Sequence, residues 1–242
     1  MAPPSLSVII PAWNEADQLP ATLDALRHAI TASDLVVEII VVDNGSDDDT
    51  AAIAHEAGAR VVREPERRIA RVRNRGAELA RSSCLLFLDA DTRITSEHLL
   101  AVRDALADRW IGGGVPVAMD RPLPRFPALG LSFWNALSRR FSLAAGCFFF
   151  VRADWHRSLG GFPEHVYAGE EIGHSRQLRQ RARRQGLTFG ILDTDPVVTS
   201  GRKLDWYATW QHALVVLVFV VFPWAGRFRR LSWFWYRRPG NR

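Results

Sequence analysis

The chain has 242 residues, of which 48% are hydrophobic and 24% charged, and its formal net charge is +5 at pH 7. This composition is typical of a folded globular domain with a sizeable core, and it excludes a disordered or low-complexity chain. The basic excess indicates an anionic partner: a phosphate-bearing substrate, a membrane or a nucleic acid. No zinc-finger spacing or aromatic RNA-binding motif accompanies the arginines, so we expect no nucleic-acid partner.

Cysteine usage and the first residues of the chain bear on its compartment. Only Cys84 and Cys147 occur, which is too few for a disulfide framework. We expect both to be buried free thiols in a reducing compartment. Residues 1–7 lack the basic and apolar regions of a signal peptide. We therefore expect a cytoplasmic location.

The first half of the chain alternates between short apolar runs and helical patterns. Runs of β-branched and other apolar residues predict strands at 6–10, 36–42, 60–62 and 84–88. Apolar residues three or four positions apart, together with helix start and stop signals, predict helices at 19–30, 51–57, 69–81 and 96–108. Strands that alternate with helices form a parallel, doubly wound sheet. The predicted fold class is therefore α/β, with a mostly parallel sheet flanked by helices.

The second half of the chain is less regular. Strands are predicted at 111–119, 146–151, 188–192 and 197–198. Helices are predicted at 129–141, where the pattern is amphipathic, and at 170–185, which is strongly basic. The character of the sequence changes near Leu204. We therefore expect one domain over residues 1–203 and a separate helical segment over residues 204–242.

Polar residues follow three of the predicted strands at the point where each strand ends. These are Asn14-Glu15, Asp43-Asn44 and Asp89-Ala90-Asp91. In doubly wound sheets, ligands bind outside the carboxyl ends of the strands. Two carboxylates with one residue between them can hold a hard divalent cation such as Mg²⁺ or Mn²⁺. The alternative for this acidic pair is a polar turn in which Asp91 caps the next helix.

These motifs, in this order, resemble those of glycosyltransferase family 2. The matching segments are 8–15 (VIIPAWNE), 41–47 (VVDNGSD), 71–76 (RVRNRG), 87–92 (FLDADT), 146–154 with 160–162 (GCFFFVRAD and GGF), and 169–171 (GEE). The resemblance covers residues 5–203. It implies a GT-A fold and a metal-dependent, inverting transfer from a nucleoside-diphosphate sugar to a hydroxyl acceptor. The Q-x-x-R-W signature of processive members is not evident, so a single transfer is expected.

The resemblance also implies a role for each matching residue. The expected nucleotide-sugar contacts are Pro11, Ala12, Trp13, Asn14, Glu15, Asp43, Gly45, Arg71, Asn74, Asp89, Ala90 and Arg202. Asp91 is the expected direct ligand of Mg²⁺ or Mn²⁺, and Asp89 is expected to bind the metal through water or to reach the ribose. Glu171 is the expected general base, with Glu170 as the alternate. A purely structural alternative is that both acids complement a helix dipole.

One departure from the family keeps alternatives open. Many GT-A enzymes place a histidine ligand on a late strand, whereas residues 197–203 contain none, so Ser200 or water would fill that position. A non-catalytic scaffold with this fold is therefore one alternative. A haloacid-dehalogenase-type phosphatase, with Asp89 as nucleophile and Asp91 as acid, is another, although that family begins with this strand. A dinucleotide oxidoreductase is disfavoured because no G-x-G-x-x-G follows the first strand.

The last part of the chain has the composition of a membrane interface. Residues 213–224 carry no charge, but a spanning helix needs about 20 such residues. Residues 227–238 combine arginines with tryptophan and tyrosine and contain no acid. We expect a peripheral or shallowly inserted hairpin at the inner membrane face, which would suit a lipid-linked acceptor. A core helix followed by a second packed helix is the alternative.

Overall fold

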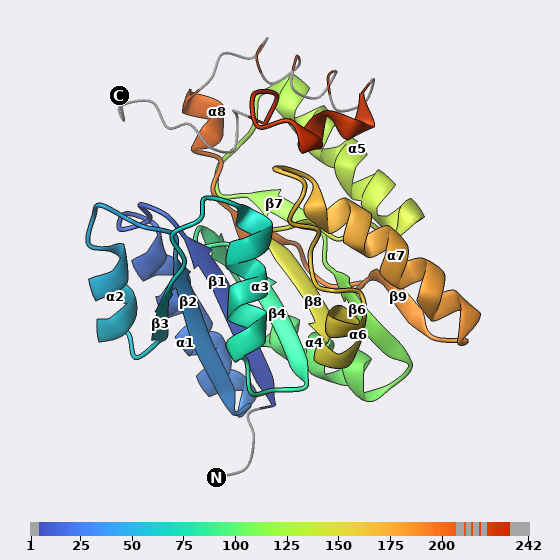
Figure 1. Cartoon of the computed structure of the whole chain (residues 1–242), viewed down its shortest axis with the longest axis horizontal. Coiled ribbons are helices and arrows are strands. Elements are labelled where there is room, and N and C mark those ends of the chain that lie inside the picture. Colours follow the sequence, from blue (N-terminus) through green and yellow to red (C-terminus); the bar gives the residue numbers. More distant parts are fainter. Residues whose placement is uncertain (1–4, 207–210, 212–213, 215–217, 219–221, 233–242) are drawn as a thin grey trace.

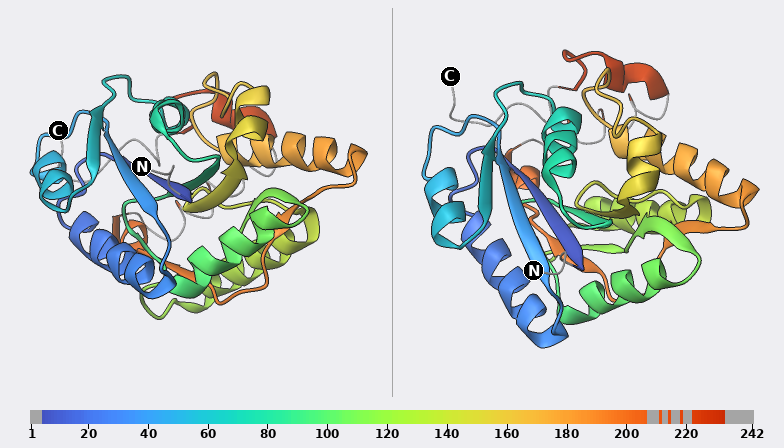
Figure 2. Two further views of the ribbon diagram at one scale, coloured as in Figure 1. Left: turned by 90° about the horizontal axis from the view of Figure 1, so that it is seen from below. Right: turned by 60° about the horizontal axis from the view of Figure 1, so that its bottom comes forward.

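The computed structural model describes residues 5–206, 211, 214, 218 and 222–232. Its centre is a seven-stranded sheet with helices on both faces (Figures 1 and 2). The strands, in spatial order, are β3 (Arg60–Arg63), β2 (Val37–Asp43), β1 (Leu6–Ala12), β4 (Cys84–Leu88), β8 (Phe148–Arg152), β6 (Trp110–Gly114) and β9 (Thr188–Ile191). The predicted α/β class with a mostly parallel sheet is confirmed.

The strand directions explain why the sheet is only mostly parallel. Strands β1, β2, β3 and β4 run parallel to their neighbours within that group, as the strand–helix alternation predicts. Strand β8 runs antiparallel to both β4 and β6, and β9 again pairs in parallel with β6. The carboxyl ends of β1 and β4 therefore lie at the same edge of the sheet.

A second, three-stranded sheet lies beside the first. It contains β5 (Thr92–Arg93), β10 (Val197–Thr199) and β7 (Val117–Met119). The single strand predicted at 111–119 is thus two strands in two different sheets, separated by Val115 and Pro116. Proline has no N–H for a ladder hydrogen bond, which explains the interruption.

Different helices cover the two faces of the large sheet. One face packs against α1 (Leu19–Ser33) and α4 (Ser96–Ala107), the other against α3 (Ile69–Leu79) and α7 (Glu170–Arg184). Other helices within the described residues are α2 (Thr50–Glu56), α5 (Arg125–Phe141), α6 (Ala153–Ser158), α8 (Lys203–Trp206) and the 3₁₀ helix Pro223–Arg227. Helix α5 begins four residues earlier than the apolar pattern predicts, directly after Pro124.

The central strands have no polar face because both of their faces are covered. All seven residues of β1 are buried. Val8 and Ile10 contribute to the core beneath α1 and α4, whereas Ile9 contributes to the core beneath α3 and α7. This alternation follows from the two-residue period of a strand. A continuous apolar run is what such a doubly covered strand requires.

Helix α3 approaches the sheet closely at Gly76. A Cβ atom at this position would lie 2.3 Å from Ile9 Cγ2. We expect Gly76→Ala to lower the free energy of unfolding by about 1–3 kcal/mol, because the core cannot admit the extra methyl without strain. Equilibrium urea unfolding measures this. The matched control is Gly130→Ala in α5, where a Cβ would have no atom within 4 Å, and where alanine's helix propensity should stabilise by up to about 1 kcal/mol. Equal effects at the two positions would contradict the prediction.

Candidate active site

A cavity of about 640 Å³ lies at the carboxyl ends of β1 and β4. This volume is in the usual range for small-molecule sites. Ten of the residues predicted from the sequence line it: Pro11, Ala12, Trp13, Glu15, Asp89, Ala90, Asp91, Glu170, Glu171 and Arg202. They come from segments up to about 190 residues apart in the chain. The fold therefore brings most of the predicted site to one place.

The acidic turn after β4 is held by its surroundings. Thr22 of α1 donates a hydrogen bond of 2.8 Å to the carbonyl of Ala90, and the Thr92 N–H donates to the carbonyl of Asp89. The Ser200 N–H donates to the carbonyl of Asp91 at 3.1 Å, which places the end of β10 beside the turn. The turn is thus fixed by contacts to its backbone, and Asp89 and Asp91 both line the cavity.

Asp91 carries a poorly compensated charge. Its side chain is 14% exposed, and burial raises its pKa, with repulsion from Asp89 adding to the effect. Arg202 and Lys203 partly oppose this rise in pKa. Arg202 Nη2 lies 3.3 Å from Asp91 Oδ2, and Thr199 Oγ1 donates to Asp91 Oδ1 at 3.4 Å. The same Arg202 nitrogen also donates to both carboxylate oxygens of Glu15, each at 2.6 Å. A cation near Asp91 would therefore be favourable.

Arg73 of α3 lies in the cavity wall, although the sequence analysis did not select it. Its Nη2 donates to Asp89 Oδ1 and to the carbonyl of Gly146, both at 2.9 Å, and its Nη1 donates to Glu170 Oε1. The side chain is 5% exposed. Burial alone would lower the pKa of Arg73, but Asp89 and Glu170 outweigh burial and raise it. Arg73 therefore stays charged and links the acidic turn to the start of α7.

The two glutamates of the site begin helix α7. Gly169 precedes them with φ of 76°, a left-handed conformation that favours glycine. Glu170 is buried and is bound by Arg73, whereas Glu171 is only partly buried. Burial and repulsion from Glu170 raise the pKa of Glu171 to about 8, against the opposing effect of Arg73. Burial also raises the pKa of Glu170, and here Arg73 opposes it more directly.

Three predicted residues lie at the edge of the site, in the contact between the ends of β1 and β2. The Asn14 N–H donates to Ser46 Oγ at 2.9 Å, and Asn14 Oδ1 accepts from the Asp47 N–H at 2.8 Å. Asp43 Oδ1 accepts from the Ser46 N–H, and Gly45 has φ of 74°. None of Asn14, Asp43 and Gly45 is among the residues that line the cavity. Their contacts with a nucleotide stay predictions.

The other two predicted residues that do not line the cavity, Asn74 and Arg71, are on α3. Asn74 Nδ2 donates to the Phe162 carbonyl at 2.9 Å, and Asn74 Oδ1 accepts from the Phe162 N–H at 2.8 Å. Asn74 therefore holds the Gly-Gly-Phe turn at 160–162. Arg71 is 43% exposed and contacts Glu64 and Glu164 at 3.3 and 3.4 Å. The matching segment contains three arginines, and of these the structure places Arg73, not Arg71, in the cavity wall.

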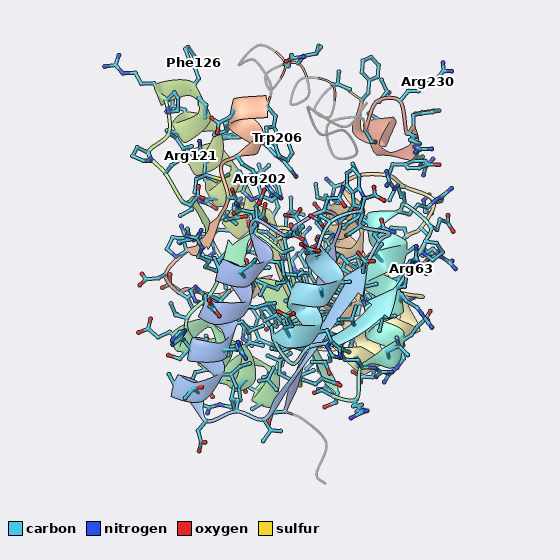
Figure 3. The ribbon with its side chains drawn as sticks, turned by 90° about the vertical axis from the view of Figure 1, so that its left-hand side faces the viewer. Arg63, Arg121, Phe126, Arg202, Trp206 and Arg230 are labelled. Carbon is cyan, nitrogen blue, oxygen red and sulfur yellow. The ribbon has the colours of Figure 1, made fainter. Side chains whose placement is uncertain are left out.

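Part of the cavity lining is an apolar wall, which the sequence patterns did not indicate. It is formed by Val117, Met119, Leu131, Trp134 and Trp206. These side chains come from β7, α5 and α8. The amphipathic pattern of α5 was visible in the sequence, but a pattern alone cannot say which face lines a cavity. Figure 3 shows Trp206 close to Arg202, whose guanidinium carbon lies 5.3 Å from the tryptophan ring.

Two histidines form a buried pair behind the glutamates. His156 Nδ1 and His174 Nε2 are 3.0 Å apart, among the rings of Phe87, Phe149 and Phe162. Burial lowers the pKa of His156 to about 3 and of His174 to about 4. Both rings are therefore neutral at physiological pH. They pack α6 against α7 rather than serve as metal ligands.

The described residues were also searched for a cluster of metal ligands and for a membrane-spanning helix. Within residues 5–206 and the described positions beyond them, no group of three His, Cys, Asp or Glu side chains is placed to hold a metal ion. None of the helices in the described part of the chain is long and apolar enough to cross a membrane. Of the predicted interfacial stretches at 213–224 and 227–238, only residues 214, 218 and 222–232 are described. The remainder of both predictions lies outside the described residues.

Comparison with known families identifies the group of proteins to which the chain is related. The sequence profile described as "Glycosyl transferase family 2" matches residues 7–155, more than half of the chain. Glycosyltransferase AglE of Haloferax volcanii is 27% identical over 214 residues, which are 83% of this chain and 70% of that protein. A PGL/p-HBAD biosynthesis glycosyltransferase of Mycobacterium tuberculosis is 38% identical over 107 residues, covering 42% of this chain and 41% of that one. The chain thus spans well under half of the mycobacterial relative.

Solved structures support the same fold. Mannosyltransferase PcManGT of Pyrobaculum calidifontis, in complex with GDP-Man and Mn²⁺, superposes with a TM-score of 0.66 at 21% identity, covering 89% of this chain and 61% of that one. Glucosyl-3-phosphoglycerate synthase of M. tuberculosis superposes with a TM-score of 0.60 at 22% identity, covering 89% and 79%. Neither the phosphatase nor the scaffold alternative is favoured by these comparisons. The chain therefore belongs to glycosyltransferase family 2, a family of enzymes that transfer sugars, and has the GT-A fold.

Proposed function

We propose that the chain transfers a sugar from a nucleoside-diphosphate sugar to a hydroxyl acceptor, in a single inverting step that depends on Mg²⁺ or Mn²⁺. One observation carries this proposal: Asp89, Asp91, Arg202 and Glu171 line one cavity at the carboxyl ends of the strands. The arrangement combines a cation site, a cationic side chain for a diphosphate and a candidate base. Among similar structures, one was solved with GDP-Man and Mn²⁺ and another with UDP-Glc and Mn²⁺.

The donor set at the acidic turn fits a hard divalent cation. Asp91 is nearly buried, and its pKa is raised by burial and by Asp89, so a positive ion there would relieve an unfavourable charge. Carboxylate oxygens are the ligands that Mg²⁺ and Mn²⁺ prefer. Asp91 would hold the ion, Asp89 would bind through water, and Ser200 or a water would supply the position that lacks a histidine. Such an ion supplies positive charge to the leaving diphosphate.

Arg202 and Lys203 fit the same diphosphate from the protein side. Both line the cavity next to Asp91. Guanidinium and ammonium groups bind phosphate oxygens, and a water-poor site strengthens that attraction. Arg202 is bound to Glu15 and Asp91. Binding of a diphosphate would therefore exchange carboxylate partners of Arg202 for phosphate oxygens.

Glu171 is the better of the two candidate bases. Glu170 is buried, and its carboxylate is bound by Arg73, which holds its negative charge in an ion pair. Glu171 is partly exposed and lines the cavity, and its raised pKa makes its deprotonated form a stronger proton acceptor than an ordinary carboxylate. In the proposed step, Glu171 takes the proton of the acceptor hydroxyl. The acceptor oxygen then bonds to the anomeric carbon as the bond to the diphosphate breaks on the opposite face.

The membrane contact also remains a proposal. We infer from the composition of residues 204–242 that this segment lies at the inner face of a membrane as a peripheral or shallowly inserted element. A lipid-linked hydroxyl is then one candidate acceptor. The apolar cavity wall formed by Leu131, Trp134 and Trp206 supports an acceptor with an apolar portion.

Thermal melting with Mn²⁺ and a panel of nucleoside diphosphates tests the donor site. A nucleotide at a hundred times its Kd stabilises the folded state by about 2.7 kcal/mol, which raises Tm by about 5–10 °C for a chain of this size. We expect one nucleotide to produce such a shift in the wild type with Mn²⁺, and Asp91→Ala to lose it. The matched control is Asp47→Ala, which removes an exposed acid that does not line the cavity. The proposal fails if no nucleotide shifts Tm, or if Asp91→Ala responds like the wild type.

A further inference from the structure

Helix α5 exposes large apolar side chains along one face. Phe126 is 80% exposed, Leu129 is 67% exposed and Phe133 is 66% exposed. These positions are three and four residues apart, so they share one side of the helix. A single exposed apolar residue is ordinary, but an aligned group on one face indicates a surface that contacts something apolar.

The opposite face of α5 is fixed to the protein. Leu131 and Trp134 line the cavity, and Ser138 is buried. Asn135 Nδ2 donates to the Val117 carbonyl at 2.8 Å, while Asn135 Oδ1 accepts from the Val117 N–H at 3.1 Å. The helix therefore cannot rotate its phenylalanines inward without breaking both hydrogen bonds. Its outer apolar face is built into the fold.

The charged residues of α5 itself are all basic. From Arg121 to Ala153 the sequence contains no aspartate or glutamate, and it contains none after Asp205. Arg125, Arg139 and Arg140 of α5 are exposed. Exposed aromatic side chains can enter the interfacial layer of a bilayer, and arginines beside them can bind anionic lipid headgroups. This combination therefore suits the surface of an anionic bilayer.

A second apolar and basic segment lies at the same end of the molecule. In residues 222–232, Phe228 is 55% and Leu231 is 42% exposed, and Arg227, Arg229 and Arg230 are exposed beside them. The Tyr167 N–H donates to the Gly226 carbonyl at 2.5 Å, which ties this segment to the loop before α7. Figure 3 shows Phe126 and Arg230 at the same end of the molecule, and Figure 1 shows α5 and the red segment there as well.

We propose that the outer face of α5 docks on an anionic lipid bilayer, with Phe126, Leu129 and Phe133 entering the interfacial layer. This adds a second element to the membrane contact proposed for residues 204–242, and it does not depend on which sugar is transferred. Because the other face of α5 lines the cavity, docking would bring the apolar cavity wall next to the lipid surface. A hydroxyl acceptor with a lipid anchor would then meet the site without leaving the membrane.

A local probe tests α5 separately from the rest of the chain. In full-length protein carrying Cys84→Ala and Cys147→Ala, Leu129→Cys is labelled with an environment-sensitive fluorophore. The matched control is Val36→Cys, since Val36 is 64% exposed and lies at the amino end of β2, where its carbonyl accepts from Ser5. Phosphatidylcholine vesicles with and without phosphatidylglycerol are then added. We expect a blue shift at position 129, only with phosphatidylglycerol, and none at position 36.

A second variant keeps the cysteines and removes the apolar face. Phe126→Ser/Leu129→Ser/Phe133→Ser changes exposed side chains only, and its Tm checks that the fold is kept. We expect its affinity for phosphatidylglycerol vesicles, measured by co-sedimentation, to fall by about tenfold or more. The reason is that aromatic and leucine side chains that enter the lipid layer supply most of the free energy of such binding.

Several outcomes would overturn the proposal, and they are distinguishable. If the protein binds vesicles but the emission of the label at position 129 does not shift, then only residues 204–242 contact the membrane. Absence of any vesicle binding would remove both membrane contacts and leave the proposed sugar transfer untouched. A blue shift at position 129 that appears without lipid and grows with protein concentration would mean that a second copy of the chain covers α5.

Discussion

Arg73→Met is expected to lower the free energy of unfolding by about 3–5 kcal/mol. The guanidinium of Arg73 is buried and binds Glu170, Asp89 and the Gly146 carbonyl at once. Its removal would leave Glu170, which is 2% exposed, as a buried carboxyl without a counter-charge. Equilibrium unfolding in urea measures the loss. The next arginine on α3 is the control: Arg75 is 43% exposed and pairs with Glu78 at the surface, so Arg75→Met should cost less than about 1 kcal/mol.

A double-mutant cycle separates the ion pair from simple loss of packing. Arg73→Met/Glu170→Gln removes both charges, and it should be less destabilised than Arg73→Met alone, because no uncompensated carboxylate remains buried. A double variant whose loss equals the sum of the two single losses would show that the pair is not coupled. Arg73→Lys keeps a charge but not the planar fork that reaches three acceptors, so an intermediate loss is expected.

Glu171→Gln is expected to reduce the rate of sugar transfer by about 100- to 10,000-fold, the usual contribution of a general base. Nucleotide binding should be retained, because the substitution keeps the size of the side chain. The measurement is the initial rate of product formation with a nucleoside-diphosphate sugar at saturating Mn²⁺. Glu171→Asp should keep part of the activity, since it shortens the side chain by one methylene but leaves a carboxylate. If Glu170→Gln abolishes transfer and Glu171→Gln does not, the assignment of the base is wrong.

The pH dependence of kcat/KM in the wild type is a second test of Glu171 as the base. Burial and Glu170 raise the pKa of Glu171 to about 8, so most of the free enzyme holds this base protonated at pH 7. A base works only when deprotonated, and kcat/KM should therefore rise as pH increases through about 8. In Glu171→Gln this rise should disappear. Arg73→Met should move it to higher pH, because Arg73 opposes the increase in the pKa of Glu171.

Much of the fold could be predicted because its determinants are local. The strand at 84–88 was predicted with the bounds that the structure shows, since an unbroken apolar run needs cover on both faces. The helices at 19–30 and 69–81 begin where predicted. The acidic turn at 89–91 and the glutamates after Gly169 follow from motif order and lie in one cavity. Parallel strands joined by helices place their carboxyl ends at one edge, which is why strand-end motifs meet.

The direction and partnership of the later strands were not readable from the sequence. Residues 111–119 form one apolar and glycine-rich run, yet β6 and β7 belong to different sheets. Strand β8 enters antiparallel between β4 and β6. Hydropathy reports only that a segment is buried; it does not report which distant segment supplies the hydrogen bonds. That choice depends on contacts between residues far apart in the chain.

Side-chain direction was decided by the tertiary structure alone. Arg71 and Arg73 are two residues apart, and with 3.6 residues per helical turn they point to nearly opposite sides of α3. Only the packing of α3 against the sheet sends Arg73 into the cavity and Arg71 toward Glu64 and Glu164. The same holds for α5, because only its packing decides which of its faces lines the cavity and which is exposed. The sequence by itself determined the alternation of strands and helices in the first half and the chemistry at the strand ends, because both depend on neighbours in the chain. Which arginine meets Asp89, and which face of α5 meets solvent, depended on packing between distant elements.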